Sequence, residues 1–362
     1  MSPIPFIQPI LAATFHYPLK LCATTTLTTY ILSLVTGNVS QVDRVWTFLP
    51  TIYTAYWALF PLWSRQNTVA TWIFPYVPAE VPNNLVRAFS PRAVLMFGLV
   101  FTWMCRLSYN TWRRGLFNLQ DEDYRWAVLR TKIPTWLFQF FNLTFIAITQ
   151  NILLLLLGLP THRALMNPTP LTPTDYALSL VALTLLALEF TADNQQFAYH
   201  AFKASEPGAY DTRAQWPGAR LGWTEADKKR GFVTRGLWAW SRHPNFWCEQ
   251  SFWGVITLFP LLSSPTAPLA LADFSSTLYA LAPLAPALAL CVLFVSSTGF
   301  TEAISLSKYP EAYGAYRKRV AMFVPWVTPV WGALLRAVSS PEEVERVERL
   351  VWGQVDEKEK VE

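Results

Sequence analysis

The chain changes from polar to apolar within residues 241–262, which read SRHPNFWCEQSFWGVITLFPLL. Four polar side chains, Arg242, His243, Asn245 and Glu249, stand at the start of this stretch, and a mainly apolar run follows them. A run of this kind indicates a helix that enters a membrane. Polar groups at the mouth of such a helix are costly to leave unpaired, so we expect this cluster to hold a polar ligand.

The composition of the rest of the chain points to a lipid environment. Of the 362 residues, 52% are hydrophobic and only 15% are charged, and the chain contains 17 Trp, 14 Tyr and 24 Phe. Mainly apolar runs of about 17 to 25 residues are typical of spanning helices. Such runs lie near residues 18–36, 46–63, 92–111, 135–157, 176–202, 246–263 and 277–301. We therefore expect an all-α, polytopic membrane helix bundle of about seven transmembrane helices.

The placement of basic residues predicts the orientation of this bundle. Most of the 29 Lys and Arg residues fall in the loops 37–45, 112–134 and 203–245 and in the tail that begins at residue 302. Cytosolic loops of membrane proteins carry such an excess of basic residues. An odd number of spans places all four segments on the same side, so we expect the N-terminus in the lumen or outside and the C-terminus in the cytosol. The endoplasmic reticulum is the expected membrane.

Charge and cysteine usage argue against other classes of protein. The net charge of +5 is spread through short loops among acidic residues, so we expect no nucleic-acid partner. The cysteines lie in or beside apolar segments without the spacing of a metal site. They are Cys22, Cys105, Cys248 and Cys291. The sequence therefore predicts neither a metal centre nor a disulfide framework.

Three segments differ in composition. Residues 1–17 form an apolar segment that prolines interrupt, and we expect it to lie at the membrane interface. Residues 18–337 would form the transmembrane domain, and residues 338–362 a charged cytosolic helix. The spacing of Ser340 and Glu343 predicts a capping box at the start of that helix. We expect the tail to be a solvated appendage without chemistry of its own.

Polar residues recur along the fifth expected span. Their spacing of four, three and four residues places them on one helical face. They are Glu189, Asp193, Gln196 and His200. A central acid that faces lipid would cost at least about 2.5 kcal/mol, so this face should point into the bundle.

The third expected span carries a second polar group. Arg106, Tyr109 and Arg113 follow one another at spacings close to one helical turn. Two interpretations stay open. Arg106 could pair with Glu189 or Asp193 and hold helices together, or these groups could bind a phosphorylated or otherwise polar ligand.

Pro244 is compatible with the first turn of the sixth expected span, because proline has no N–H to donate. We expect the N–H groups of residues 245–247 to point out of the helix end, where the helix dipole favours phosphate. Arg242 and the basic cluster 228–230 would bring mobile charge to the same anion, and Glu249 could accept a hydrogen bond from an amide or a ribose hydroxyl. The alternative is a helix cap with an arginine that reaches lipid headgroups.

The stretch from Ser241 to Phe246, followed by Glu249, resembles the C-terminal signature of the steroid 5-alpha-reductase-like superfamily, specifically of its DUF1295 branch. Further matches to that branch extend over roughly residues 40 to 326. They are Asp43-Arg44-Val45-Trp46 with Pro50, Arg106-Leu107 with Arg113, Glu122-Asp123-Tyr124-Arg125, Ala192-Asp193-Asn194-Gln195, Lys308-Tyr309-Pro310-Glu311 and Phe323-Val324-Pro325-Trp326. The matches are specific to the superfamily and do not identify a substrate.

This resemblance implies a seven-helix membrane reductase that binds NADPH from the cytosolic side, beside a steroid- or lipid-like substrate among membrane lipids. It implies that Asn245 and Glu249 contact the nicotinamide half of the cofactor, and that Asp193 and Glu189 bind ribose or adenosine hydroxyls. The other cofactor-binding candidates are Gln196, Arg242 and His243, together with Arg106, Arg113, Arg230 and Tyr309, which would surround the phosphates.

Reduction of a conjugated C=C bond needs a hydride from the cofactor and an acid at the carbonyl oxygen. The steroid reductases use a Glu on the second span and a Tyr on the third, whereas the second span here has no Glu. Tyr109 could supply the proton, with Tyr53 or Tyr56 as substitutes. Thr301 and Ser305 stand where the steroid reductases carry Arg and His, which leaves NADH possible as the cofactor.

Two other functions stay open. Isoprenylcysteine and phospholipid methyltransferases also carry an Arg-His-Pro motif ahead of a late membrane helix, and their cofactor is S-adenosylmethionine. Alternatively, the chain is a non-catalytic membrane protein that retains the fold.

Overall fold

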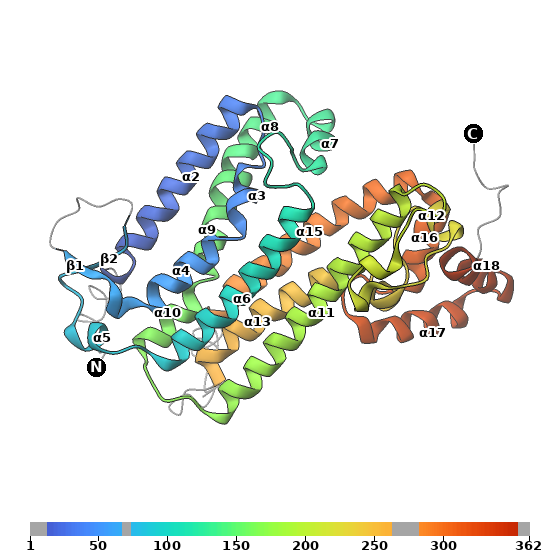
Figure 1. Cartoon of the computed structure of the whole chain (residues 1–362). Helices are drawn as coiled ribbons and strands as arrows, with labels where there is room; N and C mark the ends of the chain where they lie inside the picture. The colour runs from blue at the N-terminus through green and yellow to red at the C-terminus, as the bar shows by residue number, and fades with distance from the viewer. Residues whose placement is uncertain (1–12, 67–73, 263–281, 354–362) are drawn as a thin grey trace. The chain divides into compact units, whose positions relative to one another are not determined.

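The computed structural model describes residues 13–66, 74–262 and 282–353 (Figure 1). The chain forms two compact units. The first comprises residues 1–183 and 253–290, and the second comprises residues 184–252 and 291–362. The boundaries between them fall within three long helices, which are α11 (Pro173–Ala204), α13 (Pro244–Leu262) and α15 (Ala285–Lys308).

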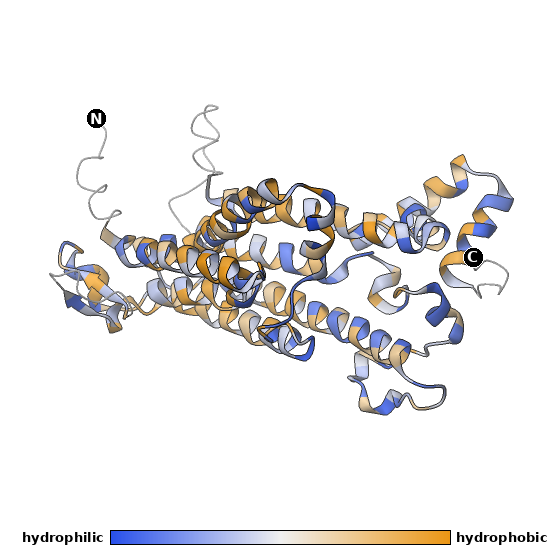
Figure 2. Cartoon of the chain, turned by 90° about the horizontal axis from the view of Figure 1, so that it is seen from above, coloured by the Kyte–Doolittle hydropathy of each residue, from blue (hydrophilic) through white to orange (hydrophobic). Residues whose placement is uncertain are grey.

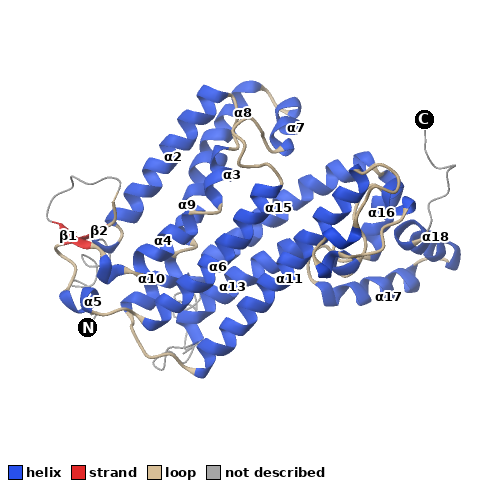
Figure 3. Cartoon of the chain, in the orientation of Figure 1, coloured by secondary structure: helices blue, strands red, loops and turns tan. Residues whose placement is uncertain are grey.

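The described part of the first unit consists of helices and one short pair of strands (Figure 3). Its helices are α2 (His16–Thr36), α3 (Gln41–Trp46), α4 (Leu49–Ala58), η1 (Phe60–Leu62), α5 (Asn83–Arg87), α6 (Pro91–Arg113), α7 (Tyr124–Lys132), α8 (Thr135–Phe141), α9 (Gln150–Leu156) and α10 (Leu159–Met166). A π-helix, Asn142–Thr149, connects α8 to α9. Strands β1 (Ser64–Gln66) and β2 (Tyr76–Pro78) pair in parallel, with Ser64 opposite Tyr76.

The core of the first unit is aromatic. Tyr53, Tyr56, Trp57 and Phe60 are each at most 1% exposed, and they pack against residues of α2, β2, α9 and α10. Gly158 permits this packing. A Cβ at that position would lie 2.8 Å from Cζ3 of Trp57 and 3.0 Å from Cβ of Tyr53, so a larger residue would displace α4.

Helix α3 and the residue Val39 before it are hydrogen-bonded to the loop between α6 and α7. Arg44, which is buried, donates through Nη2 to the carbonyls of Asn118 at 2.9 Å and Asp121 at 2.7 Å. Glu122 accepts the N–H of Val39 at 2.8 Å. Arg44 and Glu122 belong to motifs that supported the family resemblance, and these contacts give both residues a structural role.

The second unit continues from α11 through a long loop into α13, α15 and three further helices. Its short elements are η3 (Thr212–Ala214), η4 (Pro217–Ala219), α12 (Glu225–Arg230) and η5 (Gly236–Ala239). The short 3-10 helix η6 (Ala282–Leu284), which belongs to the first unit, precedes α15. After α15 follow α16 (Pro310–Arg319), η7 (Pro325–Val327), α17 (Thr328–Val338) and α18 (Pro341–Trp352).

Helix α18 begins where the sequence predicts. The side chain of Ser340 accepts the N–H of Glu343 at 3.3 Å. The expectation of a solvated appendage is wrong, because Val347, Leu350 and Val351 are buried against α16 and α17. The helix is amphipathic, and its apolar face forms part of the core of the second unit.

Among the described residues, four helical segments are long and apolar enough to cross a membrane. They are α2, the continuous segment Thr135–Met166, α11 and α15. Figure 2 shows how apolar residues dominate the long helices. The protein is therefore an all-α membrane helix bundle, as the sequence predicts.

The number of seven spans stays a prediction. Helix α4 has only ten residues, and α6 has a buried Arg92 and Arg106 among its apolar residues. Residues 277–281 of the last expected span lie outside the described residues, as do residues 1–12 of the N-terminal segment.

Candidate functional site

The polar cluster of the sixth expected span lies at the start of α13, which begins at Pro244 as predicted. The N–H of Phe246 donates to Oδ1 of Asn245 at 3.0 Å, and the N–H of Trp247 donates to the carbonyl of His243 at 3.0 Å. The expectation that these two N–H groups point outward is therefore wrong, because a side chain and the first helical hydrogen bond already satisfy them.

A buried hydrogen bond joins α13 to α11 within the second unit. Nδ2 of Asn245 donates to Oδ1 of Asp193 at 3.2 Å, and the two residues are 9% and 3% exposed. Glu189 stands one turn from Asp193 on α11, and Glu249 stands one turn from Asn245 on α13. Both acids are also buried. The carboxyl groups of Glu189, Asp193 and Glu249 and the amide of Asn245 thus lie within one helical turn of this hydrogen bond. We call these four buried side chains the buried polar centre of the unit.

The polar stripe of α11 is interior over only part of its length. Glu189 and Asp193 are buried, Gln196 is half-buried and His200 is exposed. The expectation that the stripe faces the interior is correct for the two acids and wrong for His200, which lies near the C-terminal end of α11.

Arg242 and His243 both contact Glu302 on α15. Arg242 donates through Nε to Oε1 at 2.7 Å and through Nη2 to Oε2 at 3.1 Å. Nε2 of His243 lies 3.0 Å from Oε1, and Nε of Arg317 lies 3.3 Å from Oε2. Glu302 is 2% exposed. Glu302 was not among the predicted site residues, because nothing in the sequence around it indicates a partner sixty residues away.

His243 is buried beside the Glu302 carboxylate. Burial lowers the pKa of His243, and this effect outweighs the Glu302 carboxylate, which raises the pKa. The cluster therefore combines two guanidinium groups, one carboxylate and an imidazole whose pKa is below its ordinary value.

The guanidinium of Arg230 is engaged in hydrogen bonds within the second unit. It donates through Nη1 to Oδ1 of Asp227 at 2.7 Å, through Nε to the carbonyl of Leu350 at 3.0 Å and through Nη2 to the carbonyl of Gly353 at 2.8 Å. The guanidinium thus caps the C-terminal end of α18. The expectation that the cluster 228–230 provides mobile charge is wrong for Arg230, which is 2% exposed.

Tyr309 lies beside the glycine that ends α12. Lys203 donates to the hydroxyl of Tyr309 at 3.2 Å and to the carbonyl of Gly231 at 3.0 Å. Gly231 has a φ of 91°, and the ring of Tyr309 fills the space that a Cβ would occupy. Only glycine fits this position without strain.

The long loop between α11 and α13 is held by the side chain of Gln195, a family-motif residue for which the sequence suggested no role. Gln195 donates to the carbonyl of Gly218 at 2.9 Å and accepts the N–H of Leu237 at 2.9 Å. Thr224 and Asp227 form a capping box at the start of α12. That spacing was readable from the sequence.

The remaining predicted site residues belong to the first unit. They are Tyr53, Tyr56, Arg106, Tyr109 and Arg113. Arg113 donates to Asn110 at 3.0 Å, and its guanidinium lies 5.1 Å from the ring centre of Tyr109. Tyr109 is 45% exposed, whereas Tyr53 and Tyr56 are fully buried. The hydroxyl of Tyr56 donates to the carbonyl of Tyr76 at 3.0 Å.

These features define an all-α membrane bundle with a buried polar centre. The chain belongs to the family described as "Protein of unknown function (DUF1295)", whose pattern it matches over residues 29–320. It is also 31% identical over 296 residues to "Uncharacterized protein C594.04c" of Schizosaccharomyces pombe. The aligned region covers 81% of this chain and 74% of that protein. No solved structure matches the chain.

Proposed function

We propose that this protein is a membrane-embedded, NAD(P)H-dependent reductase of a C=C bond in a hydrophobic, steroid- or lipid-like substrate. The observation that carries the proposal is the buried hydrogen bond between Asn245 and Asp193, with Glu189 and Glu249 one turn away. A central acid costs a membrane helix at least about 2.5 kcal/mol, so buried acids of this kind are candidates for function. The resemblance to the steroid reductase superfamily points to the same residues.

The chemistry of the centre suits the nucleoside parts of a dinucleotide. Ionised carboxylates only accept hydrogen bonds, and ribose hydroxyls and carboxamides supply donors. In the proposal, Asp193 and Glu189 accept from ribose hydroxyls. Asn245 and Glu249 hold the nicotinamide carboxamide, and the half-buried Gln196 adds a further polar contact.

Within the second unit, Tyr309 is the proposed phosphate contact, and the family resemblance adds Arg106 and Arg113 of the first unit as further candidates. Arg230 is left out, because its donors hold Asp227 and α18. Arg242 and His243 would act as positioning residues, since their contacts with Glu302 fix the backbone from which Asn245 follows.

When bound, the nicotinamide cofactor supplies the hydride. The protein must orient the substrate, exclude water and donate a proton where negative charge develops. Tyr109 is the proposed proton donor, and Arg113 beside its ring would stabilise the charge that remains. Tyr53 and Tyr56 are the proposed substitutes, and the hydroxyl of Tyr56 donates to the carbonyl of Tyr76.

Thermal unfolding of the purified full-length protein tests the cofactor site. A ligand at 100 times its Kd stabilises the folded state by about 2.7 kcal/mol, so NADPH or NADH should raise Tm. Asn245→Ala and Asp193→Asn should remove most of this rise while the protein remains folded. Asn142→Ala is the matched control, since it removes a buried asparagine of the π-helix that donates to Ser33. It should retain the ligand-dependent rise.

S-adenosylmethionine methyl transfer is the second candidate. Its cationic cofactor would also suit a centre with three carboxyl groups, and an Arg-His-Pro sequence precedes α13. Stabilisation by S-adenosylmethionine but not by NADPH or NADH would replace the reductase proposal. Stabilisation by none of the three would favour a non-catalytic membrane protein.

A further inference from the structure

Helix α17 is apolar on two faces. One face is buried in the second unit through Gly332 and Leu335. A second apolar stripe recurs every four residues and continues one turn ahead of the helix. It consists of Trp326, Val330, Leu334 and Val338, which are 66%, 53%, 52% and 81% exposed. An exposed, contiguous apolar stripe of this kind marks a contact with a partner or a membrane.

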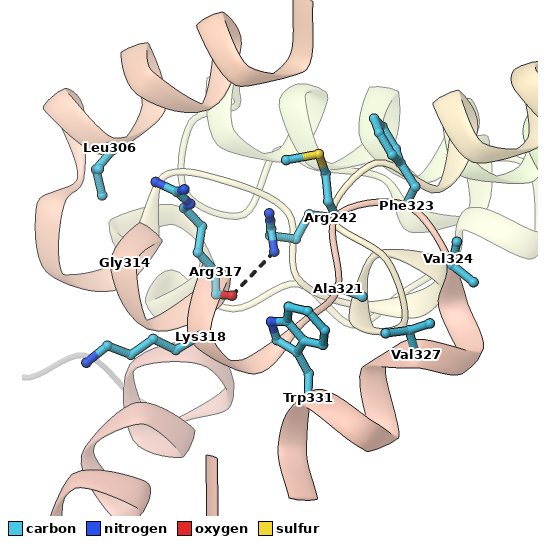
Figure 4. A pocket seen from close by; sticks show the side chains of 11 residues that line it. Arg242, Leu306, Gly314, Arg317, Lys318, Ala321, Phe323, Val324, Val327 and Trp331 are labelled. Atoms are coloured by element: carbon cyan, nitrogen blue, oxygen red, sulfur yellow. Dashed lines mark hydrogen bonds between the residues drawn. The ribbon is translucent and has the colours of Figure 1, made fainter. Parts of the chain in front are cut away.

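A pocket of about 640 Å³ adjoins this stripe within the second unit (Figure 4). Phe323, Val327 and Trp331 form much of its apolar wall. Arg317 and Lys318 of α16 stand at its edge, with side chains 44% and 58% exposed. The pocket thus combines a wall suited to a hydrocarbon chain with cations that remain open to solvent.

The ion pairs around the pocket leave an excess of positive charge. Arg242 and Arg317 share the single carboxylate of Glu302, and Lys318 pairs with Glu343 at 2.7 Å. Three cations thus stand against two carboxylates. An anion at the edge of the pocket would balance this excess.

The position of the pocket in the chain favours a lipid as that anion. Helix α15, which is apolar enough to span a membrane, ends at Lys308, and α16 starts at Pro310. Two exposed tryptophans, Trp326 and Trp331, lie a short distance further along the chain. Tryptophan is enriched where membrane and water meet, and basic residues attract the anionic headgroups of the cytosolic leaflet.

We propose that this pocket binds an anionic phospholipid of the cytosolic leaflet. Arg317 and Lys318 hold the phosphate, an acyl chain lies along Val327 and Trp331, and the exposed stripe of α17 rests among the neighbouring lipids. In this arrangement α17 is an amphipathic helix that lies in the membrane interface and anchors the unit there. The proposal does not depend on the reductase activity.

Native mass spectrometry of the full-length protein tests the headgroup preference. The protein is released from nanodiscs that contain equal amounts of phosphatidylglycerol and phosphatidylcholine. We expect it to retain phosphatidylglycerol preferentially. Arg317→Gln with Lys318→Gln should reduce that preference by about fivefold for each cation removed. Lys308→Gln with Arg336→Gln is the matched control, because both are exposed cations of the same unit outside the pocket wall, and it should behave as wild type.

Three outcomes would overturn the proposal. They are equal retention of the two lipids by the wild type, an unchanged preference in the Arg317 and Lys318 double variant, and complete displacement of the lipid by millimolar inorganic phosphate. The last result would identify a site for free phosphate.

A measurement that leaves the charges intact covers the case in which the double variant does not fold. A spin label on Val330→Cys, in a chain whose four natural cysteines are replaced, reports the surroundings of α17 in phosphatidylglycerol vesicles. We expect collisions with dissolved oxygen to exceed those with a water-soluble nickel complex. The reverse result would place α17 in water and contradict the proposal.

Discussion

Arg242 and Glu302 are 60 residues apart in the chain and form a bidentate ion pair, in which Nε lies 2.7 Å from Oε1 and Nη2 lies 3.1 Å from Oε2. Parallel hydrogen bonds of this kind are the strongest arginine–carboxylate geometry. The pair ties α15 to the backbone just before α13. Arg242 is therefore a fixed part of the fold, and the expectation that it provides mobile charge is wrong.

Glu302→Gln should destabilise the second unit strongly. The change removes the carboxylate that Arg242 and Arg317 share and leaves a buried guanidinium without its counter-charge. Breaking a buried pair from one side costs about 3–5 kcal/mol. Unfolding by denaturant in a mild detergent measures the change. Glu311→Gln, which breaks an exposed pair with Arg346, is the control and should cost less than about 1 kcal/mol. Equal effects of the two variants would argue against a special role for Glu302.

Arg230→Gln should release α18. The variant loses the charge-assisted hydrogen bonds to the carbonyls of Leu350 and Gly353, each of which contributes about 1.5–3 kcal/mol. Hydrogen exchange of the backbone amides in residues 341–352 measures the result, and faster exchange is expected. The exposed neighbour Lys229→Gln should leave exchange unchanged. Normal protection of α18 in the Arg230 variant, together with weaker NADPH binding, would restore Arg230 to the cofactor site.

The stability of the second unit should fall in acid through Asp227. Burial raises the pKa of Asp227, but hydrogen bonds from Thr224, Arg230 and Arg235 lower it more, so the pKa lies below its ordinary value. A carboxylate with a depressed pKa stabilises the fold above the pKa of the unfolded state, about 3.9, and this contribution is lost as pH falls through the folded-state pKa.

Asp227→Asn provides the test, because the amide cannot titrate. Thermal unfolding between pH 3 and 7 should show a shallower loss of stability in acid for this variant than for the wild type. The exposed Glu225→Gln on the same helix should keep the wild-type slope. Parallel acid curves for Asp227→Asn and wild type would show that other groups determine the response.

Residues 120 and 167 should lie on opposite sides of the membrane. The predicted topology places the basic loop 112–134 in the cytosol and the loop after the fourth expected span in the lumen. Gln120→Cys and Asn167→Cys, both at exposed positions, can be labelled with a membrane-impermeant reagent in sealed vesicles after replacement of the natural cysteines. Labelling of both from the same side would refute the seven-span topology.

Tyr109→Phe should lower turnover and leave cofactor affinity nearly unchanged, because a proton donor acts mainly in the transition state. Loss of a general acid costs about 100- to 10,000-fold in rate. The rate of NADPH consumption in the presence of a hydrophobic enone measures turnover. Tyr124→Phe, which alters a similarly exposed tyrosine on α7, is the control. Unchanged turnover in Tyr109→Phe would move the proposed role to Tyr53 or Tyr56.

The start of α13 could be predicted from the sequence, but the contacts of its first side chains could not. Proline preferences predicted that the helix begins at Pro244, and helical spacing placed Glu189 and Asp193 on one buried face. The same reasoning left the N–H of Phe246 open to a ligand, because it could not anticipate that the side chain of Asn245 would accept it. A side-chain rotamer depends on its neighbours in space, which local rules do not supply.

The sequence by itself determined that this protein is an all-α membrane bundle, where α13 and α18 begin and which face of α11 carries buried acids. These features follow from the length of apolar runs, from helical periodicity and from capping preferences, all of which act over a few residues. Only the tertiary structure decided that Arg242 binds Glu302 and that Arg230 caps α18. Each of these contacts joins residues 60 or more positions apart, so the partner of a charge depends on how the helices pack and not on the sequence around it.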